Sequence, residues 1–462
     1  MDDGENRTLT SSVGQMFEVT GKLTITASGE GGRLTLKGGV STESESGNIV
    51  KVIDGGTLIL EDGVLCGGKI QRNYSGAVLV RDGSTFEMTG GVIEDFTLTA
   101  SMLTGTVCVT SGGTFHMFGG TIQNNENSAD SWVYYCGGGV LLYAWNEAEP
   151  DAVMTMSGDA VIQGNYAKEG GGVYLVGNTD FQMTGGTITN NKAISFGGGV
   201  CVAGTGGSVG GGGASASNTK FVMSGGTISY NRAHRSGGVY VNSDDVTLKG
   251  GEIVNNTASN HGGGVYVSEP PQVVKIYNAV VTGNTAEVMG GGLWFCPTGD
   301  ATFSVTNGIA VYENTAEGAG DDFVSLSGST GKVTLADRML GGGAVEWYRD
   351  GAVNGGTGGG STPPQNVTGS VDSSVARFDP ENPGERLTGI TGSGNYALKA
   401  VVSGNAVELA ESQATLWITG NKAKRGGGIG SNGAALLGEE GQDYTLRVTK
   451  KWSENTPEDE KK

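Results

Sequence analysis

Apolar and polar residues alternate in short runs along most of this chain, and three kinds of run recur in a fixed order. The first run ends in Met, as in Phe181-Gln182-Met183 and Phe221-Val222-Met223. The second reads GGTIxxN, as in residues 185–191, and the third reads GGGVYV, as in residues 262–267. Because alternation at period two places successive side chains on opposite faces, each run predicts a short strand.

The repeat length is visible in the first valine of the third run. This valine falls at positions 78, 107, 140, 173, 200, 239 and 265. A basic period of about 26–29 residues with insertions explains these positions, and no helical pattern separates the strands. We therefore predict an all-β fold, a single-stranded right-handed parallel β-helix (solenoid) of roughly ten three-strand coils, stacked about 4.8 Å apart.

One asparagine recurs in each of the central repeats, two residues before an alanine. Stacked asparagines can hydrogen-bond along the axis of a solenoid and satisfy buried backbone at a corner. A general preference of Asn for turns does not explain the paired alanine. The predicted ladder consists of Asn165, Asn191, Asn231, Asn256, Asn284 and Asn314.

The repeats divide the chain into four segments. Residues 1–60 carry weaker repeats and predict an N-terminal cap with the first coils, and residues 61–325 form the main body of the β-helix. The repeat fades after residue 325 and returns once at 416–429, so residues 326–440 predict a final C-terminal coil and cap with a Gly-rich loop. Residues 441–462 hold one alternating strand and a charged tail, which differ in character from the repeats.

The amino-acid composition restricts both the fold class and the possible binding partners. The 86 glycines among 462 residues disfavour helices, and without a Gly at every third position they do not form collagen. The net charge is 29 − 48 = −19, which disfavours nucleic acid as a partner. No apolar run is long enough to cross a bilayer as a helix, so we expect no membrane insertion. The five scattered cysteines do not form a disulfide framework or a zinc-binding spacing.

The sequence shows no catalytic constellation. Polysaccharide-cleaving β-helix enzymes need carboxylates clustered on one outer face, and the outward column beside the Met run contains one acid, Glu87. The acid pairs Asp244-Asp245 and Asp321-Asp322 are interpreted as solvated turn residues. His234 and His261 lie one repeat apart but in different columns. We therefore expect no catalytic residues, no metal and no cofactor.

Aromatic residues are the candidate binding groups, because exposed amphipathic rings favour interfaces. One set follows the first Val of the third run and alternates outward, where it could form a strip for sugar rings or simply stack on itself. The other set lies in insertions, where it could bind a ligand or pack locally as a cap. The candidates are Tyr174, Tyr240, Tyr266 and Trp294 in the strip, and Trp132, Tyr134, Tyr135, Tyr143 and Trp145 in the insertions.

The GGTIxxNxA and GGGVYV repeats resemble the right-handed β-helix regions of large surface proteins of Gram-positive bacteria. They are similar, more distantly, to chlamydial polymorphic outer-membrane autotransporters. The resemblance covers about residues 55–325 and 412–430. The VxKxW stretch at 448–452 looks like the first strand of a collagen-adhesin B-type repeat domain, in which the lysine that matches Lys450 forms an isopeptide bond. The rest of that domain, with the bond partner, is missing from this chain.

This resemblance implies an extracellular, adhesin-like protein at the bacterial cell surface. We expect a monomer whose partner is a glycan or a host or matrix protein. Two alternatives stay open at this point. One is a carbohydrate-active enzyme, a polysaccharide lyase or glycosidase, on the same scaffold. The other is a structural stalk that binds no ligand.

Overall fold

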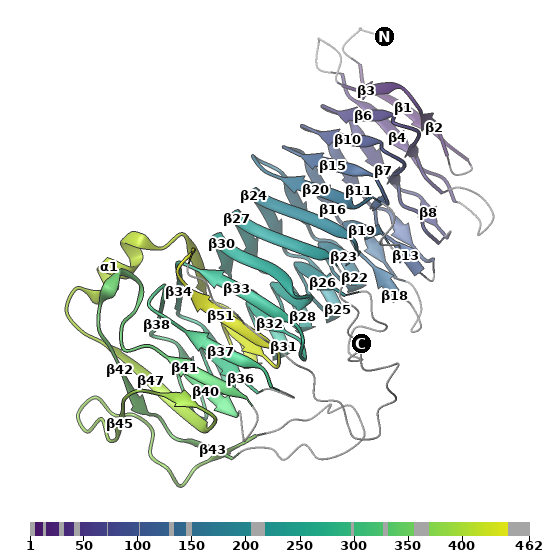
Figure 1. The fold of residues 1–462 in the computed structure, drawn as a ribbon. Coiled ribbons are helices and arrows are strands. Elements are labelled where there is room, and N and C mark those ends of the chain that lie inside the picture. The colour runs from purple at the N-terminus through teal and green to yellow at the C-terminus, as the bar shows by residue number, and fades with distance from the viewer. Residues whose placement is uncertain are drawn as a thin grey trace, which may run out of the picture.

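The computed structural model describes residues 5–12, 15–26, 32–40, 47–71, 73–100, 102–128, 134–144, 150–204, 218–296, 300–326, 331–354 and 369–441. The predicted all-β class is confirmed, because strands in three large sheets account for most of these residues. Nearly every strand pairs in parallel with the equivalent strand of the repeats before and after it, as in a β-helix. The sheets together form an elongated stack, which runs from the purple N-terminal strands to the green and yellow C-terminal region (Figure 1).

Sheet 1 has 22 strands, which form two neighbouring columns. They are β1 (Arg7–Thr10), β3 (Lys22–Ile25), β4 (Leu34–Lys37), β6 (Thr57–Leu60), β7 (Val64–Cys66), β10 (Thr85–Met88), β11 (Val92–Glu94), β15 (Thr114–Met117), β16 (Thr121–Gln123), β20 (Ala152–Met156), β21 (Val161–Gln163), β24 (Thr179–Thr189), β27 (Thr219–Ser229), β30 (Asp245–Val254), β33 (Val273–Tyr277), β34 (Ala279–Thr282), β37 (Thr302–Val305), β38 (Ile309–Tyr312), β41 (Lys332–Leu335), β46 (Thr391–Gly392), β48 (Leu416–Thr419) and β51 (Ala434–Gly438).

Sheet 2 has 15 strands and includes the GGGVYV runs. They are β2 (Phe17–Val19), β5 (Val50–Val52), β9 (Val78–Val80), β14 (Val107–Thr110), β19 (Val140–Ala144), β23 (Val173–Gly177), β26 (Val200–Ala203), β29 (Val239–Asn242), β32 (Val265–Val267), β36 (Leu293–Phe295), β40 (Phe323–Leu326), β42 (Val345–Arg349), β45 (Arg386–Leu387), β47 (Asn395–Val402) and β50 (Ile429–Ser431).

Sheet 3 has ten strands, and two further pairs complete the strand set. The sheet 3 strands are β8 (Lys69–Ile70), β12 (Thr97–Leu98), β17 (Glu126–Asn127), β22 (Tyr166–Glu169), β25 (Lys192–Phe196), β28 (Arg232–Arg235), β31 (Thr257–His261), β35 (Thr285–Met289), β39 (Thr315–Ala316) and β49 (Lys422–Arg425). The pairs are β13 (Met102–Thr104) with β18 (Tyr134–Cys136), and β43 (Ala352–Asn354) with β44 (Ser370–Asp372).

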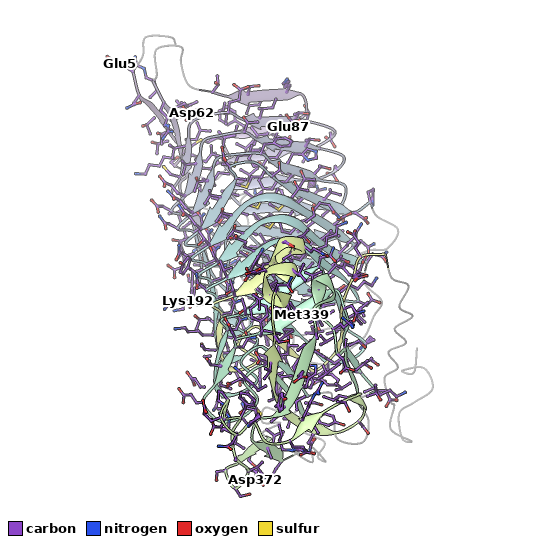
Figure 2. All side chains as sticks on the ribbon, turned by 90° about the vertical axis from the view of Figure 1, so that its left-hand side faces the viewer. Glu5, Asp62, Glu87, Lys192, Met339 and Asp372 are labelled. Atoms are coloured by element: carbon purple, nitrogen blue, oxygen red, sulfur yellow. The ribbon has the colours of Figure 1, made fainter. Side chains whose placement is uncertain are left out.

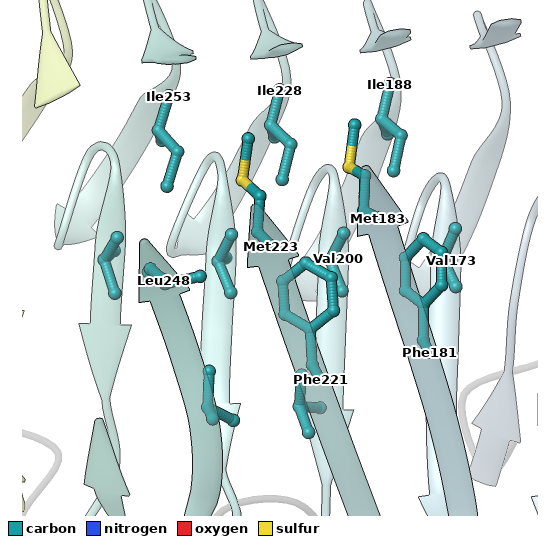
Figure 3. Packing of buried hydrophobic residues seen from close by; sticks show 14 of the residues in the cluster. Val173, Phe181, Met183, Ile188, Val200, Phe221, Met223, Ile228, Leu248 and Ile253 are labelled. Atoms are coloured by element: carbon teal, nitrogen blue, oxygen red, sulfur yellow. The ribbon is translucent and has the colours of Figure 1, made fainter. Parts of the chain in front are cut away.

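Inward-facing side chains from the three sheets form one continuous core. In sheet 1, equivalent residues of successive coils stack on one another, for example Phe181 on Phe221, with ring centroids 5.1 Å apart. The methionine and isoleucine columns fill the space above these rings (Figure 3). Because each inward residue has a like residue one coil away, the core is built from columns of repeated side chains.

The predicted final coil lies within the stack. The chain forms a coil from β48, β49, β50 and β51, and this coil pairs with β30, β31, β32 and β33 on one side. On the other side it pairs with β34, β35, β36 and β37. In Figure 1, the yellow β51 lies beside the teal-green β33. Residues 416–438 therefore form an intercalated coil, in contrast to the expectation of a terminal one.

The crossover occurs at Asn278, between β33 and β34. In β24, β27 and β30 one strand runs through both columns of sheet 1, whereas the chain at Asn278 (φ 49°) moves one level along the stack. The backbone carbonyl of Asn278 accepts hydrogen bonds from Thr415 and Leu416, at the start of the intercalated coil. The step from Val265 to Leu293 has the ordinary repeat length. The sequence spacing therefore does not reveal that another coil lies between these two repeats.

The parallel stack ends at a cap of antiparallel strands. β47 pairs in antiparallel fashion with β40 and β42, and β46 does so with β41. A 3-10 turn η1 (Leu340–Gly342) and helix α1 (Ala406–Gln413) pack together near β38. From α1 the chain returns to enter the intercalated coil.

The predicted asparagines are buried and hydrogen-bonded from coil to coil. Each side-chain amide nitrogen donates to the Oδ1 of the next asparagine at 2.9–3.1 Å, and the same Oδ1 accepts from a backbone N–H. Asn421 of the intercalated coil stands between Asn256 and Asn284, which the sequence spacing had made neighbours. The order is Asn125, Asn165, Asn191, Asn231, Asn256, Asn421, Asn284 and Asn314.

An aspartate ends this ladder, which corrects the interpretation of the Asp321-Asp322 pair as solvated. Asp322 is fully buried, and its Oδ1 accepts from the backbone and side-chain nitrogens of Asn314 at 3.0 Å. Its Oδ2 accepts from the Ala400 backbone in the cap. Asp321 makes ion pairs with Arg377 and Lys399. The carboxylate therefore joins the last coil to the cap.

We predict that Asn231→Ala destabilises the protein by about 2–5 kcal/mol, because it leaves two nitrogens of Asn191 without their acceptor in a buried site. Urea unfolding followed by circular dichroism measures this. Asn260→Ala is the control, since this partly exposed amide makes only a 3.4 Å contact with His234. Equal stability of the two variants would contradict a structural role of the ladder.

Candidate functional site

The outer face of sheet 3 carries two columns of outward side chains. The alanine of each NxA motif points inward and is buried, so the residues immediately before and after it point to solvent. Register aligns the first column as Tyr166, Lys192, Arg232, Thr257, Lys422, Thr285 and Thr315. The second column contains Lys168, Ile194, His234, Ser259, Lys424, Glu287 and Glu317.

Basic residues gather in the middle of these columns. We call Lys168, Lys192, Arg232, Lys422 and Lys424 the basic face. Figure 2 shows Lys192 at the side of the stack. Within the described part of the chain, no carboxylate lies within ion-pair distance of Lys192, Arg232, Lys422 or Lys424. This concentration of positive charge contrasts with the net charge of −19.

Aromatic and apolar groups lie among these cations. The Lys192 ammonium lies over the Tyr166 ring, 5.4 Å from its centroid. The side chains of Tyr230 and Ile194 are each 55% exposed. Such a mixture of charged and ring-bearing side chains suits a ligand that has both anionic groups and flat apolar faces.

A surface hollow adjoins the basic face. It has a volume of about 490 Å3 and lies on the alanine column of four neighbouring coils. Its polar lining comes from Thr257, Thr285, Thr315, Lys422 and the two glutamates Glu287 and Glu317. Because Lys422 belongs to the intercalated coil, this hollow forms only when that coil is in place.

The predicted aromatic strip is buried, which corrects the sequence interpretation. Tyr174 and Tyr240 are 0% exposed, and Tyr266 and Trp294 are 1% exposed. These residues do face away from the main core, as the alternation predicts, but a second apolar cluster covers them. The last residues of several sheet 3 strands, such as Phe196 and His261, pack over the column. The strip is therefore unavailable to a ligand.

Of the candidate aromatic residues in the insertions, the structure describes only the side chain of Tyr143. Trp132 and Trp145 lie outside the described residues, as do the side chains of Tyr134 and Tyr135. Tyr143 is partly buried, and its ring centroid lies 6.0 Å from that of Tyr74. Their role in binding stays a prediction.

A glutamate is buried at the end of β22. Glu169 is 6% exposed, and burial raises its pKa to about 7, opposed by Lys168 and by a hydrogen bond with Tyr174. None of the five cysteines forms a disulfide bond. Burial also raises the pKa of the nearby Cys136 thiol to about 11, so this thiol is neutral at physiological pH.

In the described ranges, no group of three or more His, Cys, Asp or Glu side chains is arranged to hold a metal ion. No helix among them is long and apolar enough to cross a membrane. Comparison with protein families, curated proteins and solved structures found no match to this chain.

Sequence reasoning missed the basic face, although its signal was present. The ladder asparagine is followed directly by a cation in Asn191-Lys192, Asn231-Arg232 and Asn421-Lys422. The alternation within NxAx places both variable positions outward. Aligning these positions by repeat would have shown the cations, but not that Lys422 lies between Thr257 and Thr285.

We predict that Glu169→Gln stabilises the protein increasingly as the pH rises from 4.5 to 8. The folded pKa is raised to about 7 from 4.5, so wild-type stability from this group is full below pH 4.5 and is lost as the pH rises through 7. The neutral amide escapes this loss, and the shift corresponds to about 3 kcal/mol. Urea unfolding of both proteins at pH 4.5 and pH 8 measures the difference. A gain independent of pH would contradict the prediction.

Proposed function

We propose that this chain is a non-catalytic ligand-binding protein whose basic face binds an extended anionic glycan. The observation that carries this proposal is the clustering of five Lys and Arg side chains on one face of a strongly acidic protein. The scaffold is a single right-handed parallel β-helix of roughly ten coils. Its regular stacking places the outward side chains of successive coils about 4.8 Å apart along the axis.

The spacing of the cations suits a polymer. Lys192 and Arg232 lie in adjacent coils, and Lys422 lies two coils beyond Arg232. A chain with acidic groups along its length can contact several of these side chains at once. Tyr166 and Tyr230 supply ring faces for sugars, and the adjoining hollow supplies threonine hydroxyls.

The resemblance of the repeats to surface proteins supports an adhesin-like role. We place the protein outside the cell, at the bacterial surface, as a monomer that displays the β-helix to a glycan. A rigid solenoid is suited to this display, since its stacked coils hold binding side chains in fixed positions. The match of Lys450 to a stalk-domain strand is in keeping with this location.

Glycoside hydrolysis is a second candidate, favoured by one observation. Glu287 and Glu317 lie in adjacent coils and both line the hollow, as paired carboxylates do in glycosidases. Both side chains are exposed, whereas a general acid is usually held in a desolvated setting. Binding without turnover therefore fits this pair better. Release of shorter products by the wild type, but not by Glu287→Gln, would favour hydrolysis instead.

The binding proposal is tested by reversing charge on the basic face. We expect the double variant Lys192→Glu/Arg232→Glu to bind uronate-containing or sulfated oligosaccharides at least about tenfold more weakly than wild type, because attraction becomes repulsion. Isothermal titration calorimetry at low and high salt measures this, and the wild-type affinity should fall as salt rises.

The matched control is Lys22→Glu/Lys332→Glu, which makes the same charge change at two exposed lysines of sheet 1. This variant should keep the wild-type affinity within about twofold, since its changes lie on another face. Equal losses in both double variants would show a net-charge effect and overturn the assignment to the basic face. Binding of neutral oligosaccharides with equal affinity would overturn the anionic ligand class.

A further inference from the structure

Three basic side chains from consecutive coils converge where sheet 3 turns into sheet 2. Arg235, His261 and Arg425 are each the last residue of a sheet 3 strand, and register places them in that order along the axis. A residue with positive φ follows each of them, for example Gly262 with φ 65°. The sharp turn lays these side chains on the outer surface of sheet 2. Arg425 is next to His261 only because its coil is intercalated.

His261 lies within an aromatic stack. Its ring centroid is 5.7 Å from that of Tyr266 and 4.7 Å from that of Trp294. The intercalated coil places Gly430 between Tyr266 and Trp294 in sheet 2, and a Cβ there would lie 3.1 Å from Tyr266 Cδ2. The absence of a side chain at Gly430 leaves room for the imidazole. The guanidinium of Arg235 lies over the same Tyr266 ring, at 5.9 Å.

The polar atoms of this cluster lack partners within the described part of the chain. These atoms are the Nε of Arg235, the Nε of Arg425, both ring nitrogens of His261 and the Nε1 of Trp294. All of them are buried, and the Arg425 residue as a whole is only 6% exposed. Buried nitrogen donors are nearly always hydrogen-bonded in folded proteins. Several unpaired donors in one place therefore indicate an acceptor that the described residues do not supply.

The charges in this cluster are also unbalanced. Neither Arg235 nor Arg425 has a carboxylate within ion-pair distance among the described residues. Burial, together with Arg235, Arg425, His234 and Lys424, lowers the pKa of His261 well below its usual value. A buried cation without a counter-charge is strongly unfavourable.

We propose that Arg235, His261 and Arg425 form a binding site for one oxyanion, a carboxylate or sulfate group that accepts hydrogen bonds from these donors. The site lies on the outer surface of sheet 2, behind the basic face, so it extends beyond the proposed function and does not require it. The oxyanion has two possible sources, a free inorganic ion or an acidic group of the glycan. The planar guanidinium forks of two arginines match the geometry of either source.

Titration of the full chain with inorganic sulfate, in buffer free of sulfate and phosphate, tests the site. We expect one bound sulfate per chain by calorimetry, with a shift of the His261 ring resonances in NMR spectra. Arg425→Met keeps the apolar stem and removes the charge, and it should weaken this binding at least about tenfold. Arg425→Lys should restore part of the affinity, because it keeps the charge but loses the fork.

A stability measurement keeps the test independent of folding defects. Without sulfate, Arg425→Met should unfold at a higher temperature than wild type, because an unpaired buried charge is removed. With sulfate, wild type should gain thermal stability and Arg425→Met should not. Lack of 1:1 sulfate binding to wild type, or unchanged binding by Arg425→Met, would overturn the proposal.

The matched control is Arg232→Met, which removes a cation from the basic face in the coil of Arg235. It should bind sulfate as wild type does but bind the anionic oligosaccharide more weakly. Adding sulfated oligosaccharide in place of sulfate distinguishes the sources. If the glycan supplies the group, the oligosaccharide shifts the same His261 resonances and sulfate competes with it. If only the free ion enters, those resonances stay unchanged and the two ligands do not compete.

Discussion

The hydrogen bonds between buried asparagines are the interaction on which the rest of this structure depends. Each amide donates to the next amide along the axis and to a backbone carbonyl of the preceding coil, for instance from Asn191 to Ile162. An asparagine that shifted by one residue would leave several buried polar groups unpaired, at about 1–3 kcal/mol each. The ladder therefore fixes the register of every coil it passes through. It also explains why a coil from far along the chain fits between two others.

Because the register is fixed, the variable positions of successive repeats align and form continuous surfaces. Because the ladder asparagine and the inward alanine are held in place, the residues beside them form straight outward columns. The intercalated coil contributes Lys422 and Lys424 to those columns, two coils from Arg232, and its Arg425 lies next to His261. The crossover at Asn278 thus adds Lys422 and Lys424 to the basic face and completes the Arg235–His261–Arg425 cluster. Without the intercalated coil, the basic face would keep only Lys168, Lys192 and Arg232, and the cluster would lose Arg425.

Local patterns predicted the strands, the inward Met and Ile columns and the asparagine positions, since each depends only on alternation within a repeat. The position of the 416–438 coil could not be predicted, because all repeats have similar shapes and any coil can stack on any other. The prediction that the aromatic strip is exposed was wrong for a related reason. Alternation showed that Tyr266 faces away from the core, but it could not show that His261 and the ends of the sheet 3 strands cover it.

Amide hydrogen exchange across the intercalated coil, resolved by mass spectrometry, tests the intercalation most directly. Amides of β48–β51 lie between two layers of strands, so their exchange should require opening of the whole stack. We expect residues 416–438 to exchange as slowly as the flanking strands β30–β33 and β34–β37. Exchange of 416–438 as fast as that of the edge strand β1, while the flanking strands stay protected, would contradict intercalation and with it the place of Lys422, Lys424 and Arg425 beside the other cations.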